Sequence, residues 1–433
     1  MTLPPYVIKI METLNSHNKE AYAVGGCVRD LLLEQPPTDF DVATSALPRE
    51  IMAIFPKTVP TGIKHGTVTV FMDGVPVEVS TFKGLDIGQG SLSEDLRHRD
   101  FTINAIAIDA ARVIYDPFGG REDLREKIIR SPLNQSRERF QEDPLRMLRA
   151  IRFAVCLGFT LHPSVTEAMA ECYPSISQVS IERIREELNK ILVSDRPSLG
   201  IRLLLEHNLL EYIIPEAMPM VGFDQYNKNH DKDVFQHALA VLDGVPPRLN
   251  VRWAAFLHDI GKPATFTRDE KGVGHFYGHH LKGQEITRQI LERLRYDHKT
   301  IEDITTLVGA HMTRFARFRN ANLKKLVSQV GEHNLQDLYD LQKADILGSA
   351  PPFDFTSLEE MQAEIEQILR EKHPLTIEDL AVNGYDLMEI GIEPGPGMGK
   401  LLNQLLEIVL EEPQKNNRGT LLELSKKLSQ QMQ

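Results

Sequence analysis

The sequence has 433 residues, of which 42% are hydrophobic and 25% charged, and its formal net charge at pH 7 is -12. This balance is typical of a soluble globular protein with roughly two to four domains. No run reaches the ~18 consecutive apolar residues of a membrane span, which excludes an integral membrane protein. The N-terminal residues lack an export signal, and the three scattered cysteines are too few for a disulfide framework or a thiolate zinc site. We therefore expect a cytoplasmic protein with no membrane partner.

The charge is unevenly distributed along the chain. A net charge of -12 argues, taken alone, against nucleic-acid binding, because phosphates attract Lys and Arg. Residues 119–152, however, hold eight Arg and one Lys against six acidic residues, while acidic residues concentrate in 357–412. A local basic face therefore stays possible on an acidic protein.

The first third of the chain has the pattern of an α/β domain. Gly25-Gly26 separates a short apolar strand from an amphipathic helical segment, and Asp73-Gly74 is a strong hairpin signal between two alternating segments. The predicted elements are a strand at 21–24, a helix at 27–33, strands at 38–44, 67–72 and 75–82, and extended segments at 101–109 and 113–117.

From residue 136 the hydrophobic period becomes helical and stays so nearly to the end. We expect one continuous helix over 136–158. The whole chain is predicted to consist of a head (1–135), a helical neck (136–195), a helical body (196–350) and a helical tail (351–433).

Two acidic residues mark the segment TDFDVAT. Asp39 and Asp41 are two apart, so in a strand both carboxylates point to one face. Hard oxygen ligands of this kind suit Mg²⁺ bound together with substrate phosphates; the alternative is a solvated strand edge. Gly25 and Gly26 let backbone N–H groups approach a phosphate, with Arg29 one turn further on, although a plain tight turn uses the same glycines.

Six motifs occur in the order typical of one family. They are VGGCVRDLLL, TDFDVATSALP, EVSTF, EDLRHRDFTINAIAID, DPFGGREDL and RFQEDPLRMLRAIRFA. Together they resemble the class II tRNA nucleotidyltransferases and bacterial poly(A) polymerases of the polymerase-beta-like superfamily.

This resemblance implies an α+β fold: a polymerase-beta-like nucleotidyltransferase head, with a small mixed sheet and helices, followed by an all-α neck, an HD-type body and a tail. It also implies that Asp39 and Asp41 hold two Mg²⁺ ions while the tRNA 3′-OH attacks the α-phosphate of a nucleotide and releases pyrophosphate. Glu78 is either a third acid near these ions or an outward-facing strand carboxylate.

The helical segment after residue 141 carries a second polar group. On a continuous helix Glu142, Asp143, Arg146 and Arg149 share one side, which by itself is most simply a solvated face with an Asp143–Arg146 ion pair. The resemblance instead makes Asp143 and Arg146 an amino-acid template for incoming CTP and ATP, because a carboxylate accepts from cytosine N4 and a guanidinium donates to base acceptors. Arg149 is predicted to bind nucleotide beside them.

The segment RHRDFTIN resembles the family's ribose-recognition motif. Arg99, Asp100 and Asn104 match it, whereas His98 stands where the family commonly has an Arg. Turn or cap chemistry is the alternative for Asp100 and Asn104. DPFGG, residues 116–120, matches a motif at the head–neck junction and is either a hinge or an ordinary turn.

The connection between Phe82 and Glu94 is only eleven residues long. Family members that build the whole CCA end generally carry a longer flexible segment here, and CC-adding members lack it. We therefore expect the CC-adding subtype, with full CCA addition as the alternative.

The middle of the chain carries histidines and aspartates on separate helical segments. His237, His258, Asp259 and Asp345 follow the order of the HD phosphohydrolase superfamily. The resemblance implies a site for a divalent transition metal, with His279 and His311 as extra ligands or phosphate contacts. An inactive helical body with packed histidines is the alternative.

The tail carries the segment EPGPGMGK before a helical pattern, which is either a phosphate contact or a helix-to-helix turn. The resemblance implies that tRNA is gripped through its acceptor arm and T-arm, with CTP and possibly ATP as substrates. Poly(A) polymerase is a close rival, since the head is shared. A metal-dependent HD phosphohydrolase with a nucleotide-binding head and a noncatalytic RNA-binding protein are further alternatives. The sequence predicts no oligomeric state.

Overall fold

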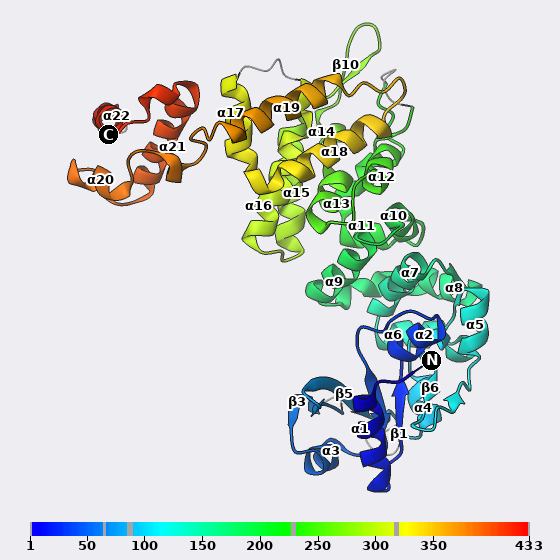
Figure 1. The fold of residues 1–433 in the computed structure, drawn as a ribbon. Coiled ribbons are helices and arrows are strands. Elements are labelled where there is room, and N and C mark those ends of the chain that lie inside the picture. Colours follow the sequence, from blue (N-terminus) through cyan, green and yellow to red (C-terminus); the bar gives the residue numbers. More distant parts are fainter. Residues whose placement is uncertain (1, 64–65, 85–89, 227–230, 316–319, 432–433) are drawn as a thin grey trace. The chain divides into compact units, whose positions relative to one another are not determined.

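The structure is a computed structural model that describes residues 2–63, 66–84, 90–226, 231–315 and 320–431 (Figure 1). The chain divides into two compact units, Met1–Ile213 and Ile214–Gln433. Within the described ranges no helix has both the length and the apolar character needed to cross a membrane.

The first unit contains a seven-stranded mixed sheet among its described residues. Its strands are β1 Ala21–Val24, β2 Asp41–Thr44, β3 Thr58–Gly62, β4 Thr67–Met72, β5 Val75–Thr81, β6 Ala107–Ile108 and β7 Ile114–Tyr115. Their order is β3-β4-β5-β2-β1-β6-β7, in which β2 and β5 run parallel and the other neighbours antiparallel. The alternating apolar residues of β4 and β5 are buried, as the period of two predicts.

The β4–β5 hairpin turns through Asp73 and Gly74, as predicted. Both residues have positive φ, 52° and 83°. Two consecutive positive φ values are the mark of the tight two-residue hairpin turn that Asn-Gly and Asp-Gly favour.

Helices cover the sheet and continue beyond it. The helices of the first unit are α1 Pro5–Ser16, α2 Gly26–Leu32, α3 Pro48–Ile54, α4 Leu92–Arg97, α5 Gly120–Glu126, α6 Ser136–Glu142, α7 Leu145–Leu157, α8 Pro163–Cys172, α9 Ile181–Leu192, α10 Pro197–Glu206 and α11 Leu209–Ile213, with a 3-10 turn η2 at Thr102–Asn104. Helix α1 buries Val7, Ile10, Met11 and Leu14 against β1, β2 and β4. Helix α7 packs on α9 and α10 through its apolar side.

The predicted continuous helix over 136–158 is wrong at one point. Helix α6 ends at Glu142, and α7 begins at Leu145. Asp143 has the extended values φ -149° and ψ 99°. The reason is Pro144, whose ring disfavours helical backbone in the preceding residue. Asp143 therefore belongs to neither helix, and the prediction that it shares a helix side with Arg146 and Arg149 is also wrong.

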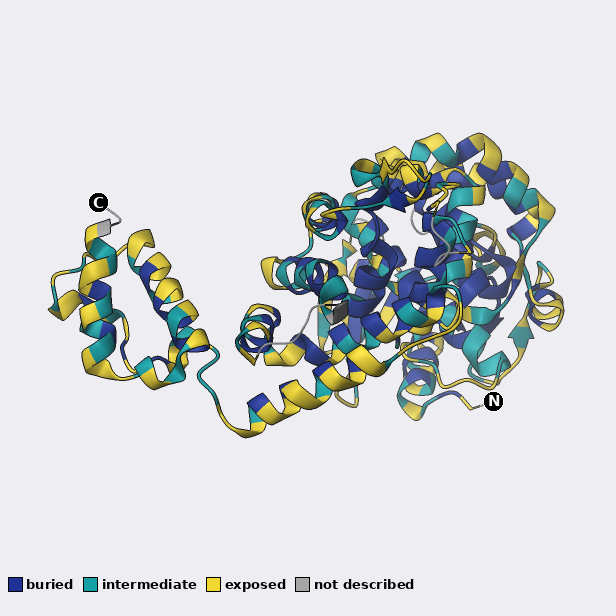
Figure 2. Cartoon of the chain, turned by 90° about the horizontal axis from the view of Figure 1, so that it is seen from above, coloured by how far each residue is buried: buried dark blue, intermediate teal, exposed yellow. Residues whose placement is uncertain are grey.

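The second unit is almost entirely helical. Its helices are α12 Val234–Gly244, α13 Leu249–Leu257, α14 Lys262–Thr265, α15 His279–Arg293, α16 His298–Ala310, α17 Asn320–Val330, α18 Leu335–Gly348, α19 Thr356–Arg370, α20 Gly384–Glu389, α21 Pro396–Glu411 and α22 Arg418–Gln431. Buried residues line the inner sides of these helices and exposed residues their outer sides (Figure 2). Helices α21 and α22 share a small apolar core that includes Leu405, Val409 and Leu421.

The α+β fold class is confirmed, with a mixed sheet in the head and helices beyond it. Two small two-stranded sheets were not predicted. They pair Ile128–Ile129 with Thr160–Leu161, and Thr267–Arg268 with Gly274–His275. The expected all-α neck and body therefore each include a short stretch of β-structure.

Candidate functional site

At the turn between β1 and α2, the guanidinium of Arg99 and the carboxylate of Asp41 lie close to Gly25. Gly25 has φ 81°, and a Cβ placed on it would lie 2.7 Å from Nη1 of Arg99 and 3.7 Å from Oδ2 of Asp41. Only glycine tolerates both this backbone conformation and this approach. The structure thus gathers Gly25, Gly26, Arg99 and Asp41, four of the predicted site residues, in one place.

Asp41 lies at the start of β2, between two neighbouring strands. It is in register with Val24 of β1 and with Glu78 of the parallel strand β5, so the side chains of Asp41 and Glu78 project from the same face of the sheet. Burial raises the pKa of Asp41; the Arg99 guanidinium opposes the rise, and the carboxylates of Glu78 and Asp39 add to it. Glu78 is exposed and lies in register with Asp41, so its role as a third acid near the metal ions stays a prediction.

Asp39 is exposed and precedes the strand, which begins at Asp41. The prediction that both residues belong to one strand is therefore wrong. The residues before Asp41 make no pairing with β1 or β5, so the period-two argument does not apply to Asp39. Its carboxylate is nevertheless close enough to affect the pKa of Asp41.

Arg99 is held in place by Asp95, which the sequence analysis did not single out. Nη2 of Arg99 lies 3.1 Å from Oδ2 of Asp95, and Oδ1 of Asp95 accepts the backbone N–H of Lys83 at 3.1 Å. Asp95 is buried and four residues before Arg99. The i,i+4 spacing in EDLRHRD is the signal that could have revealed it.

A chain of polar contacts joins α2, η2 and α7. Nη1 of Arg29 donates to Oδ1 of Asn104 at 2.9 Å, and Nδ2 of Asn104 donates to Oδ1 of Asp100 at 2.9 Å. Arg149 donates from Nε and Nη2 to Oδ2 of Asp100 at 2.9 and 2.6 Å. Four predicted nucleotide-binding residues are thus one connected network.

The network contains a buried ion pair. Burial alone would raise the pKa of Asp100, but the Arg149 guanidinium, with the hydrogen bonds from Asn104 and the Phe101 N–H, holds that pKa well below its usual range. Asp100 in turn raises the pKa of Arg149. Both groups are therefore charged at neutral pH, and Asp100 is fixed in orientation.

Phe153, which the sequence analysis assigned only to an apolar helix, lies under three guanidinium groups. The Cζ atoms of Arg29, Arg149 and Arg152 are 5.0, 5.4 and 4.0 Å from its ring centre. Cation–π contacts of this kind orient guanidinium groups as well as stabilise them. No single-residue signal reveals this role, because it depends on α2 and α7 meeting.

Asp143 and Arg146 do not pair with each other, contrary to the simplest reading of the sequence. Asp143 is bound by Arg183 of α9, whose Nη1 and Nη2 lie 3.2 and 2.7 Å from its two carboxylate oxygens. Arg146 contacts Glu142 at 2.9 Å and donates to the backbone carbonyls of Arg139 and His98. Pro144 turns Asp143 away from α7 and toward α9.

His98 has a defined tautomer. Its Nδ1 lies 2.9 Å from Nη1 of Arg139, and a guanidinium can only donate, so Nδ1 accepts. Burial and the Arg139 charge lower the pKa of His98. The neutral ring therefore carries its proton on Nε2, which is available as a donor.

The DPFGG segment is a helix cap. Both carboxylate oxygens of Asp116 accept backbone N–H groups, from Gly120 at 2.7 Å and Arg121 at 2.9 Å. A Cβ on Gly120 would lie 2.1 Å from the carbonyl oxygen of Thr102, so α5 begins in close contact with η2. The hinge role stays a prediction.

The short connection after Phe82 falls partly outside the described residues, which exclude 85–89. Its two described ends lie against each other, because a Cβ on Gly90 would be 2.4 Å from the carbonyl oxygen of Lys83. Ser91 then caps α4 by accepting the N–H of Glu94.

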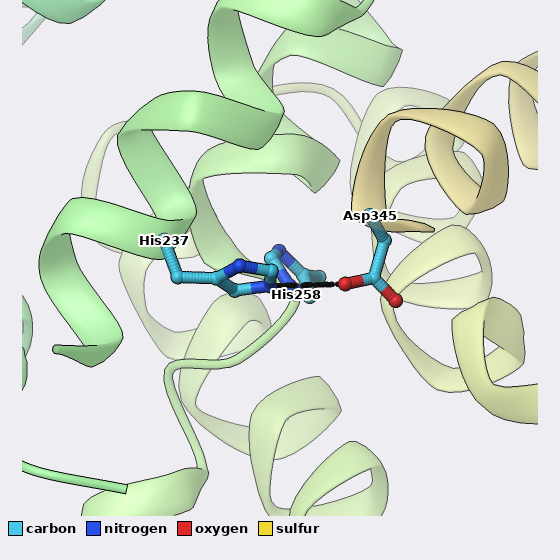
Figure 3. Close-up of side chains that lie close together, drawn as sticks. All are labelled: His237, His258 and Asp345. Atoms are coloured by element: carbon cyan, nitrogen blue, oxygen red, sulfur yellow. Dashed lines mark hydrogen bonds and ion pairs between the residues drawn. The ribbon is translucent and has the colours of Figure 1, made fainter. Parts of the chain in front are cut away.

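The second unit gathers the predicted histidines and aspartates into one buried cluster. His237 of α12, His258 after α13 and Asp345 of α18 point toward one another (Figure 3). Nε2 of His237 is 2.9 Å from Oδ1 of Asp345 and 3.3 Å from Nε2 of His258. Helices α12, α13 and α18 pack against each other, which is what brings distant sequence positions together.

Asp259, His279 and His311 complete the cluster, and all three are buried. Oδ2 of Asp259 is buried without a hydrogen-bond partner of ordinary geometry, although Nζ of Lys262 lies 2.7 Å away. Lys262 was missed in the sequence analysis; its i,i+3 spacing from Asp259 was the available signal.

A cavity of about 710 Å³ opens on the cluster. Its lining includes Asp259, Lys262, His279, His311 and Asp345. Imidazole and carboxylate groups converging on a cavity fit a divalent transition metal, and the packed-histidine alternative stays open because Lys262 and His258 lie within ion-pair distance of Asp259.

Three family models match the chain. They are the poly A polymerase head domain at residues 21–130, the RNA and SrmB-binding site of polymerase A at 158–220, and tRNA nucleotidyltransferase domain 2 at 276–424.

Curated relatives and solved structures agree with these models. The CCA-adding enzyme of Anoxybacillus flavithermus is 32% identical over 96% of this chain and 95% of its own length. The CCA-adding enzyme of Geobacillus stearothermophilus is 45% identical over 48% of this chain and 55% of its own. The crystal structure of the Bacillus stearothermophilus CCA-adding enzyme in complex with CTP superposes with a TM-score of 0.73 at 30% identity, covering 99% of this chain and 100% of that one.

A more distant structure shares the fold. The Thermotoga maritima CCA-adding enzyme complexed with tRNA-CCA has a TM-score of 0.58 at 21% identity, covering 98% of this chain and 96% of that one. The full-length similarity at 32% identity, together with the motif order and the head site, settles the family. The chain therefore belongs to the class II tRNA nucleotidyltransferases, the family that includes the CCA-adding enzymes and shares its head domain with poly(A) polymerase.

Proposed function

We propose that this chain adds CMP residues from CTP to the 3′ end of tRNA and stops after two, without a nucleic-acid template. The proposal rests on the acidic face formed by Asp39, Asp41 and Glu78 beside the Gly25 turn. A relative of similar fold was solved with CTP. In this proposal the head (1–135) carries the chemistry, while the neck (136–195), body (196–350) and tail (351–433) hold the acceptor arm and T-arm of tRNA.

The acidic face fits Mg²⁺. Its donors are all carboxylate oxygens. Burial raises the pKa of Asp41 and the carboxylates of Glu78 and Asp39 add to the rise, so a bound cation would stabilise the ionised form of Asp41. Asp39 and Asp41 would hold two Mg²⁺ ions, which supply charge stabilisation for the attacking 3′-oxygen and for the pyrophosphate leaving group.

The residues around this face have distinct roles in the proposal. The backbone N–H groups of the Gly25-Gly26 turn and the Arg99 guanidinium neutralise phosphate oxygens, since Arg99 already reaches Gly25. Asp100 and Asn104, fixed by Arg149 and Arg29, orient the ribose.

The base is read by protein side chains. Asp143 accepts from cytosine N4, and Arg146 donates to the ring acceptors. Arg149 carries no direct base contact in this scheme and positions Asp100. A site that leaves its buried polar groups unpaired with the wrong base discriminates strongly against it.

The limit of two additions is inferred from the short connection between Phe82 and Glu94. The packing of Gly90 on Lys83 draws its described ends together. Such a connection offers little chain to reshape the pocket around Asp143 and Arg146 from cytosine to adenine. Full CCA addition is the alternative outcome.

The test offers purified protein a tRNA that lacks its 3′ CCA, with Mg²⁺ and CTP, ATP or both. We expect two C residues with CTP alone and no further A when ATP is added. Asp41→Asn abolishes addition, whereas Asp73→Asn, on the distant hairpin turn, leaves it intact. A third residue, A, in the mixed reaction contradicts the two-C limit, and A tails on a poly(A) primer identify a poly(A) polymerase.

A second candidate function is carried by the buried cluster. His237, His258, Asp259 and Asp345 are proposed to bind one divalent transition-metal ion, with Lys262 facing the same cavity. A metal-dependent phosphohydrolase uses such a donor set. Hydrolysis of p-nitrophenyl phosphate in the presence of Mn²⁺ or Ni²⁺, lost in His258→Gln while CMP addition is retained, supports this activity; no hydrolysis with any divalent metal contradicts it.

A further inference from the structure

Asp95 is a buried carboxylate of the head that binds two separate segments of the chain. It lies on α4, and its side chain is 4% exposed. Its Oδ1 accepts the backbone N–H of Lys83 at 3.1 Å, and its Oδ2 accepts hydrogen bonds from Nε and Nη2 of Arg99 at 3.3 and 3.1 Å. Because each oxygen has its own donor, the carboxylate is fixed in the direction that it offers to Arg99.

The contact with Asp95 determines how the Arg99 guanidinium is turned. Asp95 occupies the Nε–Nη2 edge, and the guanidinium is planar and rigid, so the direction of the remaining amino group is set as well. That group is Nη1, which lies 2.7 Å from the position of a Cβ on Gly25. The hydrogen bonds to Asp95 thus present Nη1 at the Gly25-Gly26 turn, where glycine leaves room for it.

A second acid lies near Arg99. Oδ2 of Asp41 is 3.7 Å from the same Cβ position on Gly25, and the Arg99 charge counteracts the rise of the Asp41 pKa. The Arg99 side chain is only 23% exposed, so water screens its attraction to Asp41 incompletely. Without Asp95 the guanidinium would be drawn to Asp41. Asp95 therefore determines whether Nη1 remains available to an incoming anion.

We propose that Asp95 is a positioning residue for nucleotide addition, and that it acts by holding Nη1 of Arg99 at the Gly25-Gly26 turn, in contact with the phosphates of incoming CTP. The inference rests on the proposed function, in which the Arg99 guanidinium and the backbone N–H groups of this turn meet those phosphates. It adds the residue that sets the direction of the guanidinium before CTP arrives. A donor that is already oriented binds phosphate without the free-energy cost of ordering a long charged side chain.

The first test is Asp95→Asn in the full chain. The amide has the shape of the carboxylate and its oxygen can still accept the Lys83 N–H, but its NH₂ group faces the donors of Arg99 and cannot accept from them. We expect the Kd of CTP, measured by calorimetry with Mg²⁺ and without tRNA, to rise about 10- to 100-fold, the range of a lost hydrogen bond to a charged group. We expect kcat/KM for CTP in single-turnover addition to fall by a similar factor.

Two further variants separate positioning from a merely structural role. Arg99→Lys keeps the positive charge and leaves Asp95 bound to Lys83, but it lacks the Nε–Nη2 edge, so we expect a loss of CTP affinity of similar size. In Arg99→Gln there is no guanidinium to direct, so adding Asp95→Asn causes no further loss. Glu94→Gln is the matched control, because this exposed neighbour on α4 caps the helix through Ser91, and it retains the affinity of the unchanged protein. Circular dichroism and thermal unfolding verify that each variant is folded.

The possible failures are distinguishable. Unchanged CTP affinity in Asp95→Asn, or full affinity in Arg99→Lys, overturns the positioning role. An equal fold-loss from Asp95→Asn with and without Arg99→Gln means that Asp95 only supports the fold, and it also overturns the inference. If Asp95→Asn does not fold, Arg99→Lys decides by the same criterion. An unchanged protein that neither binds CTP nor adds CMP overturns the proposed function itself.

Discussion

Replacing Arg149 by Met removes the guanidinium from a buried carboxylate while keeping an unbranched side chain of similar length over Phe153. In the unchanged protein Arg149 donates two hydrogen bonds to Oδ2 of Asp100. The variant leaves Asp100, which is 8% exposed, with the Phe101 N–H and the Asn104 amide as its donors among the contacts of the described structure.

The size of the expected destabilisation follows from the burial of the Arg149–Asp100 ion pair. Breaking a buried ion pair by removing one partner costs about 3–5 kcal/mol. The Arg149 side chain is 32% exposed, so water compensates part of the loss, and two donors to Asp100 remain. We therefore expect a local destabilisation of about 2–3 kcal/mol, which corresponds to about 30- to 150-fold faster amide exchange.

The assay is hydrogen exchange of residues 101–106 in the full chain, read by mass spectrometry. The double variant with Asp100→Asn removes the unpaired charge and recovers most of the protection. Arg137→Met is the control, because the Arg137–Glu171 pair is exposed and contributes about 0–1 kcal/mol. Unchanged exchange in Arg149→Met, or equal loss in the double variant, refutes the reasoning.

The pH dependence of the stability loss in Arg149→Met gives a second check on this prediction. The depressed pKa of Asp100 stabilises the intact protein above the ordinary carboxyl pKa of about 3.9, and the contribution is lost only as the pH falls through the depressed value. Without the guanidinium, burial raises the folded-state pKa of this carboxyl. Lowering the pH through that raised value therefore protonates the carboxyl and shrinks the deficit of Arg149→Met. A deficit that grows as the pH falls contradicts the account.

Three further predictions concern the first unit. The raised pKa of Asp41 means that ionising this carboxyl costs the folded state free energy, so the stability of the protein falls as the pH rises from the unfolded-state pKa of Asp41 to its folded-state pKa. Asp41→Asn should therefore raise the thermal midpoint in metal-free buffer at pH 7. It should also abolish the further rise of the midpoint that Mg²⁺ causes in the unchanged protein. Gly25→Ala strains the backbone and displaces the Arg99 guanidinium, so it should cost about 1–3 kcal/mol in urea unfolding and weaken CTP binding. Gly74→Ala, also at positive φ but with nothing within 4 Å of the added Cβ, should cost about 1–2 kcal/mol and leave CTP binding unchanged. Arg183→Met releases Asp143 and should lower kcat/KM for CTP by about tenfold, or ~1.4 kcal/mol, in single-turnover addition; an unchanged preference for CTP over UTP would contradict the positioning role.

The sequence predicted β1, β4 and β5 because these strands depend on local rules, whereas it missed β3 and placed Asp39 in the strand that begins at Asp41. Alternating apolar residues placed β4 and β5, and Asp-Gly placed the turn between them. The break at Pro144 was also within reach of a local rule, since a residue before proline avoids helical backbone. The pairing of Asp143 with Arg183 was not, because forty positions separate the two residues and only the packing of α7 on α9 brings them together.

The buried cluster likewise combines features that follow from the sequence with features that depend on the packing of distant helices. The order of histidines and aspartates predicted which residues meet, and the structure places all six together. The contact between Nζ of Lys262 and Oδ2 of Asp259 at 2.7 Å, and the distances among the six residues, could not be predicted, because they are set by the packing of several helices.

Because the helix is interrupted between α6 and α7, Asp143 and Asp41 are positioned by different structural elements. Asp41 is fixed by the sheet, whereas Asp143 takes its direction from a neighbouring helix through Arg183. Under the proposed function, substitutions on the surface of α9 can therefore retune which base is accepted while the proposed bond-forming centre keeps its geometry. Nucleotide preference would in that sense be an independently evolvable property of this protein.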